Sequence, residues 1–189
     1  MEPGDRAMDE QSVVRQALGG DKEAFGLLVS RYARPVYSLM LRTVRSPDLA
    51  EDLAQEAFLK AFGNLDRFHL GKPFFPWLCT IAMNLARDHL RSQARSPLEG
   101  YELDEAAGRI PNLLEQQEDL ARSLDGRQAL RALQDLPLDY REALVLRFRQ
   151  DLSMKEIGQA LGVTVSGAKM RVQRGLAMLR QRLAQGDQP

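Results

Sequence analysis

The chain has 189 residues, of which 44% are hydrophobic, 28% charged and 6% aromatic. This composition excludes collagen-like and low-complexity proteins, and no apolar stretch approaches the ~20 residues that a membrane-spanning helix needs. The 26 Lys and Arg residues balance 26 Asp and Glu residues, so the chain is not a uniformly basic nucleic-acid binder. Any DNA-binding surface must therefore come from a local excess of positive charge.

Cysteine and histidine are scarce. Cys79 is the single cysteine, which excludes an intramolecular disulfide and a CxxC zinc site, and we interpret it as a small buried hydrophobe. The two histidines, His69 and His89, are too few for a metal centre, so we expect no metal and no cofactor. The first 30 residues contain acidic side chains and no apolar core of a signal peptide. We therefore expect a cytoplasmic protein without membrane insertion.

Apolar residues recur at helical spacing along most of the chain, and we expect an all-α fold. Asp21 is placed to cap a helix whose apolar pattern continues through Pro35. Ser46-Pro47-Asp48 supplies an N-cap, a proline at the first helical position and an acid, and begins a helix that runs to about Phe62. Two more helices of the first half are expected over 10–18 and about 76–93, with a loop over 63–73.

The chain changes character after residue 95. Residues 1–95 carry 13 basic and 12 acidic side chains, whereas residues 96–125 carry 2 and 8 and are interrupted by prolines and glycines. Residues 126–189 carry 11 basic and 6 acidic side chains. This pattern predicts two small helical domains, 1–95 and 126–189, joined by a flexible acidic linker over 96–125. A short helix over 113–124 is the alternative for part of that linker.

The second domain ends in a helix-turn-helix pattern. Ser153 and Glu156 have the spacing of a capping box, Gly162 suits a sharp turn, and Thr164 is placed to cap the next helix. On that helix the apolar residues form one stripe, namely Val165, Ala168, Val172, Leu176, Leu179 and Leu183. Residues 166–185 contain several Lys and Arg residues and no acid, which is typical of a recognition helix that enters the major groove of DNA. A solvated basic face is the alternative.

Two patterns in the first domain also indicate binding surfaces. One face of the helix over 48–62 is acidic or amidic and can dock a basic partner helix, although an ordinary solvated face explains it as well. Four of the twelve aromatic residues of the chain lie between positions 68 and 77, next to Lys, Asn and Arg side chains. Rings interleaved with cations suit single-stranded DNA, whose bases stack and whose phosphates pair. Packing in the core is the alternative; it is at least as good for Trp77 and weaker for Phe68 and His69.

Taken together, these segments resemble bacterial RNA polymerase sigma factors. The residues from Asp48 to Phe62 are similar to the helix of conserved region 2, and those from Phe75 to Leu90 are similar to the helix after it. The Leu136–Leu144 segment and the helix-turn-helix at 153–180 are similar to region 4. The short chain, with nothing but a linker between the two units, resembles the extracytoplasmic-function (group IV) subfamily.

This resemblance implies a transcription factor without catalytic chemistry, which binds core RNA polymerase, directs it to promoters and helps to melt the −10 element. The residues that would dock on the β′ coiled coil are Asp48, Glu51, Asp52, Gln55 and Glu56. The residues that would contact the −10 element are Phe68, His69, Lys72, Phe75, Trp77, Asn84, Arg87, Asp88 and Arg91. The residues that would meet the −35 element are Ser166, Lys169, Met170, Arg171, Gln173 and Arg174. Region 4 would also contact the β flap, and the subfamily implies an anti-sigma factor as a further partner.

Two other functions compete with this interpretation. A stand-alone helix-turn-helix regulator would use residues 1–95 as a ligand or dimer domain and would bind duplex DNA tightly without polymerase. A helical enzyme would need a nucleophile and base, a phosphate-binding glycine loop or a metal cluster, and the sequence contains none of these patterns.

Overall fold

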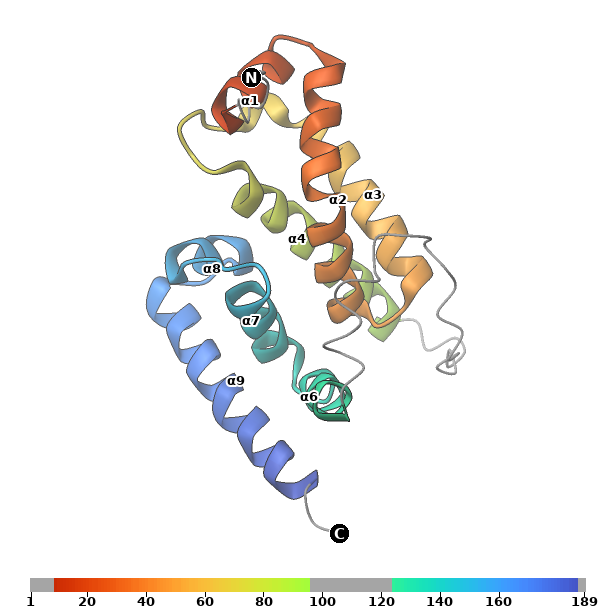
Figure 1. Cartoon of the computed structure of the whole chain (residues 1–189), viewed down its shortest axis with the longest axis vertical. Helices are drawn as coiled ribbons and strands as arrows, with labels where there is room; N and C mark the ends of the chain where they lie inside the picture. The colour runs from red at the N-terminus through yellow and green to blue at the C-terminus, as the bar shows by residue number, and fades with distance from the viewer. Residues whose placement is uncertain (1–8, 96–123, 187–189) are drawn as a thin grey trace, which may run out of the picture.

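The computed structural model describes residues 9–95 and 124–186, and within these ranges the chain is helical, without strands (Figure 1). The elements of the first unit are α1 (Glu10–Leu18), α2 (Lys22–Val44), α3 (Pro47–Gly63), the 3-10 helix η1 (Leu65–Arg67) and α4 (Phe74–Arg95). The elements of the second unit are α6 (Leu124–Gln134), α7 (Leu138–Phe148), α8 (Met154–Leu161) and α9 (Val165–Gly186). The all-α prediction is confirmed. Apart from residues 124 and 125, the predicted acidic linker lies outside the described residues, as does nearly all of the alternative short helix.

The helix starts in the first unit follow from local chemistry. The Asp21 side chain accepts hydrogen bonds from the backbone N–H groups of Glu23 and Ala24, and Ser46 accepts one from Leu49. These bonds satisfy donors that the first turn of a helix leaves unpaired. Pro35 lies inside α2 without ending it, as its apolar period predicts. The expected caps and helix boundaries are therefore confirmed to within a few residues.

The core of the first unit lies where α1, α3 and α4 pack against α2. Its fully buried side chains include Leu28, Leu39, Met40, Phe74 and Leu78. Burial of each large aliphatic or aromatic side chain contributes roughly 1.5–3 kcal/mol to folding. This core fixes α3 and α4 relative to each other; α3 carries the predicted polymerase residues, and α4 carries six of the nine predicted −10 residues.

The second unit contains the expected helix-turn-helix. Ser153 and Glu156 form the capping box reciprocally, Gly162 ends α8 in the left-handed conformation with φ 64°, and Thr164 accepts a hydrogen bond from Gly167 N–H. Ala168 and Val172 are buried against α7 and α8, as the apolar stripe predicts. Val165 was expected in that stripe but is 52% exposed, because it is the first residue of α9 and precedes the contact with the other helices.

Gly158 allows the tight approach between α8 and the turn. A Cβ at this position would lie 2.9 Å from the carbonyl oxygen of Val163, which is backbone and cannot rotate away. We expect Gly158→Ala to lower the free energy of unfolding by about 1–3 kcal/mol through this overpacking. Gly26→Ala is the matched control, because a Cβ there meets nothing within 4 Å and should stabilise α2 by roughly 0.5–1 kcal/mol. Urea denaturation measures both, and equal stabilities of the two variants would contradict the expectation.

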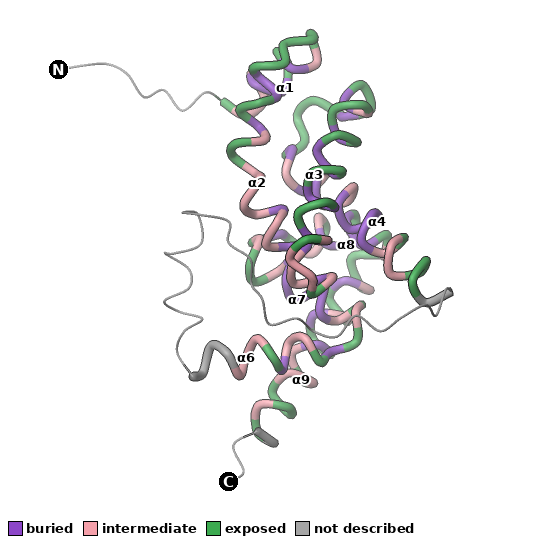
Figure 2. Tube along the Cα trace, turned by 90° about the vertical axis from the view of Figure 1, so that its right-hand side faces the viewer, coloured by how far each residue is buried: buried purple, intermediate pink, exposed green. Residues whose placement is uncertain are grey.

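The two units pack against each other along α4 and α8 and along α2 and α7 (Figures 1 and 2). We call this the closed arrangement. Helices α4, α7 and α8 all carry buried residues, which are purple in Figure 2. Each unit therefore contributes a helical face that is buried by the other unit as well as by its own core.

Candidate nucleic-acid and protein interfaces

The acidic face of α3 is exposed along its whole length, as the sequence predicts. We call it the acidic stripe; its members are Asp48, Glu51, Asp52, Gln55 and Glu56. Within it Gln55 donates a hydrogen bond to Glu51 at 3.4 Å, and Glu56 pairs with Lys60 at 3.0 Å. Such exposed pairs contribute little to stability, so these side chains are free to exchange partners.

An apolar groove lies beside the acidic stripe, between α2 and α3. It encloses about 630 Å³, and its walls include Phe25, Val29, Phe58 and two members of the stripe, Glu51 and Gln55. Two large hydrophobic side chains at this groove are exposed, Leu59 by 73% and Phe62 by 42%. An apolar centre with a charged rim is the composition of a protein–protein interface.

Leu59 and Phe62 are not among the residues predicted for this surface. The sequence pattern could have indicated that Leu59 is exposed. It follows the inward-facing Phe58 and lies off the apolar stripe of its helix, at a position where a polar residue is expected.

The aromatic residues after α3 are mostly structural. Phe68 is 5% exposed, and its ring meets those of Phe74 and Trp77 edge-on, with centroid distances of 5.7 and 5.3 Å; the rings of Phe74 and Trp77 are tilted against each other at 5.5 Å. The interpretation of Phe68 as a base-stacking ring is therefore corrected for this structure, because burying three rings together is more favourable than leaving them in water. Phe75 stacks on Tyr32 at 5.0 Å and is only partly buried. His69 and Lys72 remain exposed on the loop.

A polar hollow lies beside these rings. It encloses about 300 Å³, and three of the predicted −10 residues line it: Trp77, Asn84 and Asp88. Three polar residues outside the predicted set, Lys60, Asn64 and Arg67, also line it, together with Ile81 and Leu85. Asp88 also pairs with Arg91 at 3.8 Å on the surface. The hollow is thus large enough for a nucleic-acid base. Its lining includes one aromatic ring, amide donors and acceptors, and two cations.

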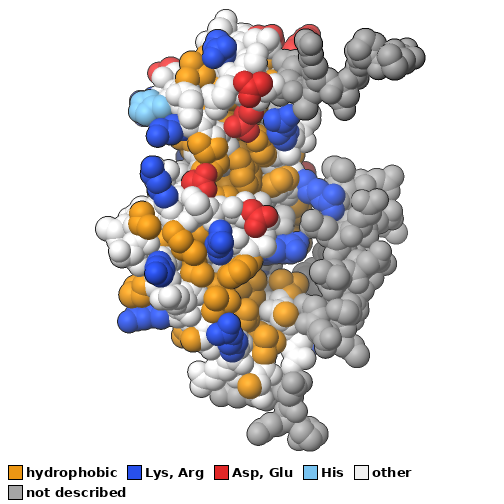
Figure 3. Space-filling model, turned by 60° about the vertical axis from the view of Figure 1, so that its left-hand side comes forward, with side chains coloured by type: hydrophobic (Ala, Val, Ile, Leu, Met, Phe, Trp, Pro, Cys, Tyr) orange, Lys and Arg blue, Asp and Glu red, His pale blue; other side chains and the backbone are white. Residues whose placement is uncertain are grey.

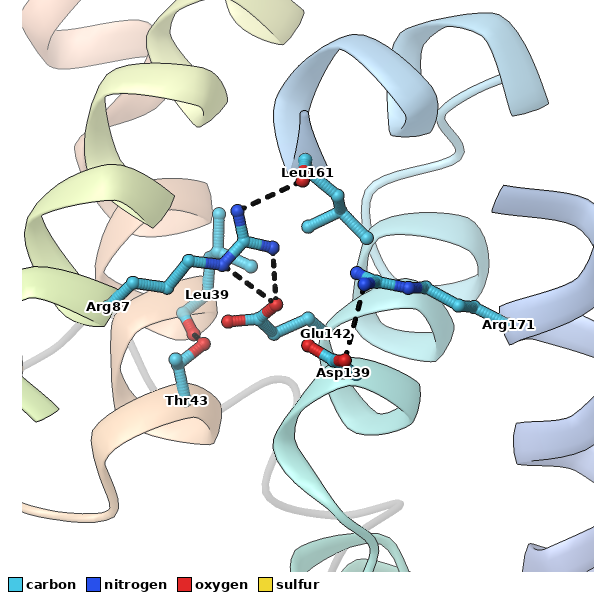
Figure 4. A network of polar contacts seen from close by, with 7 residues as sticks. All are labelled: Leu39, Thr43, Arg87, Asp139, Glu142, Leu161 and Arg171. Atoms are coloured by element: carbon cyan, nitrogen blue, oxygen red, sulfur yellow. Dashed lines mark hydrogen bonds and ion pairs between the residues drawn. The ribbon is translucent and has the colours of Figure 1, made fainter. Parts of the chain in front are cut away.

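Arg87 does not belong to this hollow. Its Nε and Nη2 atoms donate to one carboxylate oxygen of Glu142 in α7, at 3.2 and 2.6 Å, and its Nη1 donates to the carbonyl oxygen of Leu161 at 3.2 Å (Figure 4). The side chains of Arg87 and Glu142 are 14% and 0% exposed. In the closed arrangement Arg87 therefore binds the second unit, and the expectation that it contacts DNA does not hold for this state.

Glu142 is the centre of the contact between the units. Burial raises its pKa, and the Arg87 guanidinium opposes that rise. Its neighbour Arg141 donates to the carbonyl oxygens of Gln134 and Thr43, the latter in α2, and burial lowers its pKa to about 10. Neither Arg141 nor Glu142 is among the predicted site residues, because charges on a short helix are ordinarily solvated.

The face of α9 opposite the core carries the predicted −35 residues. Five of these are exposed: Ser166, Lys169, Met170, Gln173 and Arg174. Arg171 instead pairs with Asp139 of α7 at 3.2 Å and is mostly buried, so it braces α9 against its own unit (Figure 4). On the face drawn in Figure 3, Lys and Arg side chains are spread over the whole height of the described residues, whereas the acidic side chains lie in the upper half.

Two further features of the described part of the chain bear on reactive chemistry, namely its buried thiol and the arrangement of its metal-ligating side chains. Cys79 is fully buried and burial raises the pKa of its thiol, which agrees with its interpretation as a small hydrophobe. Among residues 9–95 and 124–186, no three His, Cys, Asp or Glu side chains are grouped so that they could hold a metal ion. Within the same ranges no helix has the length and apolar character to span a bilayer.

Comparison with known proteins decides the family. The family model described as Sigma-70 region 2 matches residues 28–96, and that described as Sigma-70, region 4 matches residues 126–179. The chain is 34% identical over 180 residues to the ECF RNA polymerase sigma factor SigW of Bacillus subtilis (strain 168), covering 90% of this chain and 94% of SigW. The chain belongs to the ECF sigma factors of the sigma-70 family. It is also 36% identical over 175 residues to the ECF RNA polymerase sigma-E factor of Escherichia coli (strain K12), covering 87% and 89%.

Two solved sigma-factor structures resemble the whole chain. One is CnrH in complex with the cytosolic domain of CnrY, with a TM-score of 0.69, 26% identity and coverage of 95% of this chain and 99% of CnrH. The other is the sigma factor RpoE in complex with the anti-sigma factor NepR from Bartonella quintana, with a TM-score of 0.69, 25% identity and coverage of 87% and 98%. The ECF sigma factor described here is thus a transcription initiation protein for RNA polymerase, and not an enzyme or a stand-alone regulator.

Arg174 is an exposed cation on α9 and one of the residues that the sequence predicts at the −35 element. We expect Arg174→Ala to cost roughly 1–3 kcal/mol of discrimination between the cognate −35 sequence and its single-base variants, since an Arg–guanine pair contributes about that much. Competition binding of the polymerase holoenzyme to duplex promoter variants measures this difference. Uniform weakening on all sequences would instead show that Arg174 meets a phosphate.

Proposed function

We propose a division of labour between the two units of this sigma factor. Residues 1–95 bind core RNA polymerase and the −10 element, residues 126–189 bind the −35 element, and the acidic segment 96–125 connects them and runs near the polymerase active site. The observation that supports this most strongly is that both family models match one chain in order, at 28–96 and 126–179. The protein works in the cytoplasm, where core polymerase and promoter DNA are found.

Docking on core polymerase is assigned to the acidic stripe together with the apolar groove. The stripe supplies negative charge for the β′ coiled coil, which steers association and fixes the register of the two partners. The groove, with Leu59 and Phe62 at its edge, supplies the apolar area that a stable interface buries at its centre. Region 4 makes a second, independent contact with the β flap.

The −10 element is assigned to the loop over 63–74 and the polar hollow beside it. A base of the non-template strand leaves the duplex at a cost of a few kcal/mol, which stacking and pocket contacts offset. The hollow fits this role because Trp77 offers a ring, Asn84 and Asn64 offer amide donors and acceptors, and Arg67 offers a cation for phosphate. His69 and Lys72 extend the same surface along the strand.

Arg87 is assigned two states. In the closed arrangement it is bound by Glu142, and when the units separate on polymerase it is released beside the polar hollow, where it can meet the −10 strand. The closed arrangement is therefore incompatible with use of Arg87 on DNA. It is a resting state of the free protein.

An anti-sigma factor is the partner that would hold this resting state. The support is that the two solved structures described above are complexes, one with the cytosolic domain of CnrY and one with the anti-sigma factor NepR. Purification of the protein from its own cells tests this assignment. A stoichiometric protein partner is expected, and full constitutive activity of the lone chain in cells would contradict it.

Binding to core polymerase and to DNA separates this proposal from a stand-alone regulator. We expect the purified chain to form a stable one-to-one complex with sigma-free core polymerase in gel filtration. We also expect it to bind duplex promoter DNA weakly without the core, because a lone recognition helix makes few base contacts and the linker repels DNA. Tight duplex binding by the chain alone, without a complex with the core, would overturn the proposal.

A further inference from the structure

Helix α1 is hydrogen-bonded to the loop that precedes α4, sixty residues away in sequence. The amide of Gln11 binds the loop backbone twice: its Oε1 accepts from Gly71 N–H at 2.7 Å, and its Nε2 donates to the Lys72 carbonyl oxygen at 2.8 Å. The loop also forms a turn of its own, in which Lys72 N–H donates to the His69 carbonyl oxygen at 3.1 Å. Gly71 has φ +86°, a conformation that glycine adopts without strain.

Glu10 holds the end of the same loop. One carboxylate oxygen accepts from the backbone N–H of Phe74, the first residue of α4, at 2.9 Å, and the other accepts from the Tyr32 hydroxyl in α2. A carboxylate at this position satisfies a donor that the helix leaves unpaired and favourably meets the positive end of the helix dipole. Burial and the nearby Glu10 raise the pKa of Tyr32 to about 12, so the phenol stays a donor at neutral pH.

The side chains of the loop remain available while its backbone is held. His69, Leu70 and Lys72 are exposed, and His69 and Lys72 make no side-chain hydrogen bond or ion pair among the described residues. The ends of the loop are fixed by the buried rings of Phe68 and Phe74. The middle has no buried side chain, so its backbone is held by the contacts from α1 and by the turn between His69 and Lys72.

We propose that Glu10 and Gln11 are positioning residues that preorganise this loop for single-stranded promoter DNA. The inference rests on the proposed capture of the −10 strand by the loop over 63–74. A loop that is already ordered does not pay its ordering entropy on binding, so its affinity for the strand is higher. Neither residue touches the DNA; both act through the loop backbone that carries His69 and Lys72.

The packing of α1 does not depend on the hydrogen bonds of Glu10 and Gln11. Val13, Val14 and Ala17 anchor α1 in the core at 0–4% exposure. Substitution of Gln11 therefore releases the loop without detaching α1. Gln11→Met keeps the length of the side chain and removes both hydrogen bonds, and Gln16→Met is the matched control, because Gln16 lies exposed on the same helix.

The test uses the full-length chain bound to core polymerase. The probe is a fluorescent single strand that carries the non-template −10 sequence of a promoter mapped from this holoenzyme. Gln11→Met and Glu10→Ala should each weaken binding of this strand roughly tenfold, Glu10→Gln should restore most of the loss, and Gln16→Met should have no effect. Affinities for core polymerase and for the −35 duplex should stay unchanged, and amide exchange at Gly71 and Phe74 should accelerate in the two weakened variants.

The outcomes separate this inference from the function on which it rests. Unchanged strand affinity in Gln11→Met, with accelerated exchange at Gly71, would overturn the positioning role and leave strand capture standing. Failure of the unsubstituted holoenzyme to bind the strand would overturn strand capture itself. Equal loss of strand, core and duplex binding would show that α1 is needed only for folding, and this also contradicts the inference.

Discussion

Asp52→Lys should weaken binding of this sigma factor to core RNA polymerase by about 2–4 kcal/mol, or roughly 30- to 1000-fold, because a like charge placed against a basic partner costs several kcal/mol. Asp52 lies in the middle of the acidic stripe and is exposed, so its reversal changes the charge of that surface without disturbing the core. Titration of labelled protein with sigma-free core polymerase, followed by fluorescence anisotropy, measures the loss.

The control for this prediction is another charge reversal. Asp66→Lys changes an exposed acid of η1 that lies outside the acidic stripe and should leave core affinity within about threefold of the original, as is usual for isolated surface charges. Binding of the −35 duplex by Asp52→Lys should also be intact. Equal loss of core and duplex binding would indicate unfolding, and unchanged core affinity would remove the acidic stripe from the interface.

Glu142→Ala should open the closed arrangement. Removal of one partner of a buried ion pair leaves the other charge without compensation, which costs about 3 kcal/mol and shifts the closing equilibrium roughly 150-fold. The penalty falls on the closed state alone, because Arg87 regains water when the units separate. Energy transfer between dyes on α3 and α9 measures the separation in the free protein, and the variant should bind core polymerase more tightly because no closed state has to be broken.

The matched control removes an exposed ion pair within the second unit. Asp135 pairs with Arg182 at 3.7 Å, and both side chains are at least 42% exposed, so Asp135→Ala should leave the distance between the dyes unchanged. Glu142→Gln retains an acceptor for Arg87 and should open the units less than Glu142→Ala. A dye distance in Glu142→Ala that matches the unsubstituted protein would show that this pair does not hold the units together.

Much of the local structure could be predicted because it depends on short-range chemistry. The caps at Asp21, Ser46 and Ser153 and the turn at Gly162 are encoded within four residues of each helix end, and the structure confirms them. The exposure of the acidic face of α3 and of five of the six predicted −35 residues could also be predicted, because the apolar stripe of an amphipathic helix indicates which face is exposed to solvent.

The contacts between distant segments could not be predicted. The helical period of α4 shows that Arg87 is polar, but not that Glu142 of another unit lies opposite it, 55 residues away. Phe68 is next to polar residues in sequence and is buried only because Phe74 and Trp77 come back beside it. The same holds for Gln11, whose partners lie sixty residues along the chain and are backbone atoms, which leave no trace in side-chain patterns.

Transcription in vitro tests the central claim most directly. Sigma-free core polymerase is incubated with genomic DNA fragments, with and without the purified chain, and the 5′ ends of the transcripts are sequenced. We expect a new set of start sites that share one sequence near −10 and another near −35, and that disappear with the Asp52→Lys protein. Core polymerase that starts transcription at the same places with and without the chain would contradict the account.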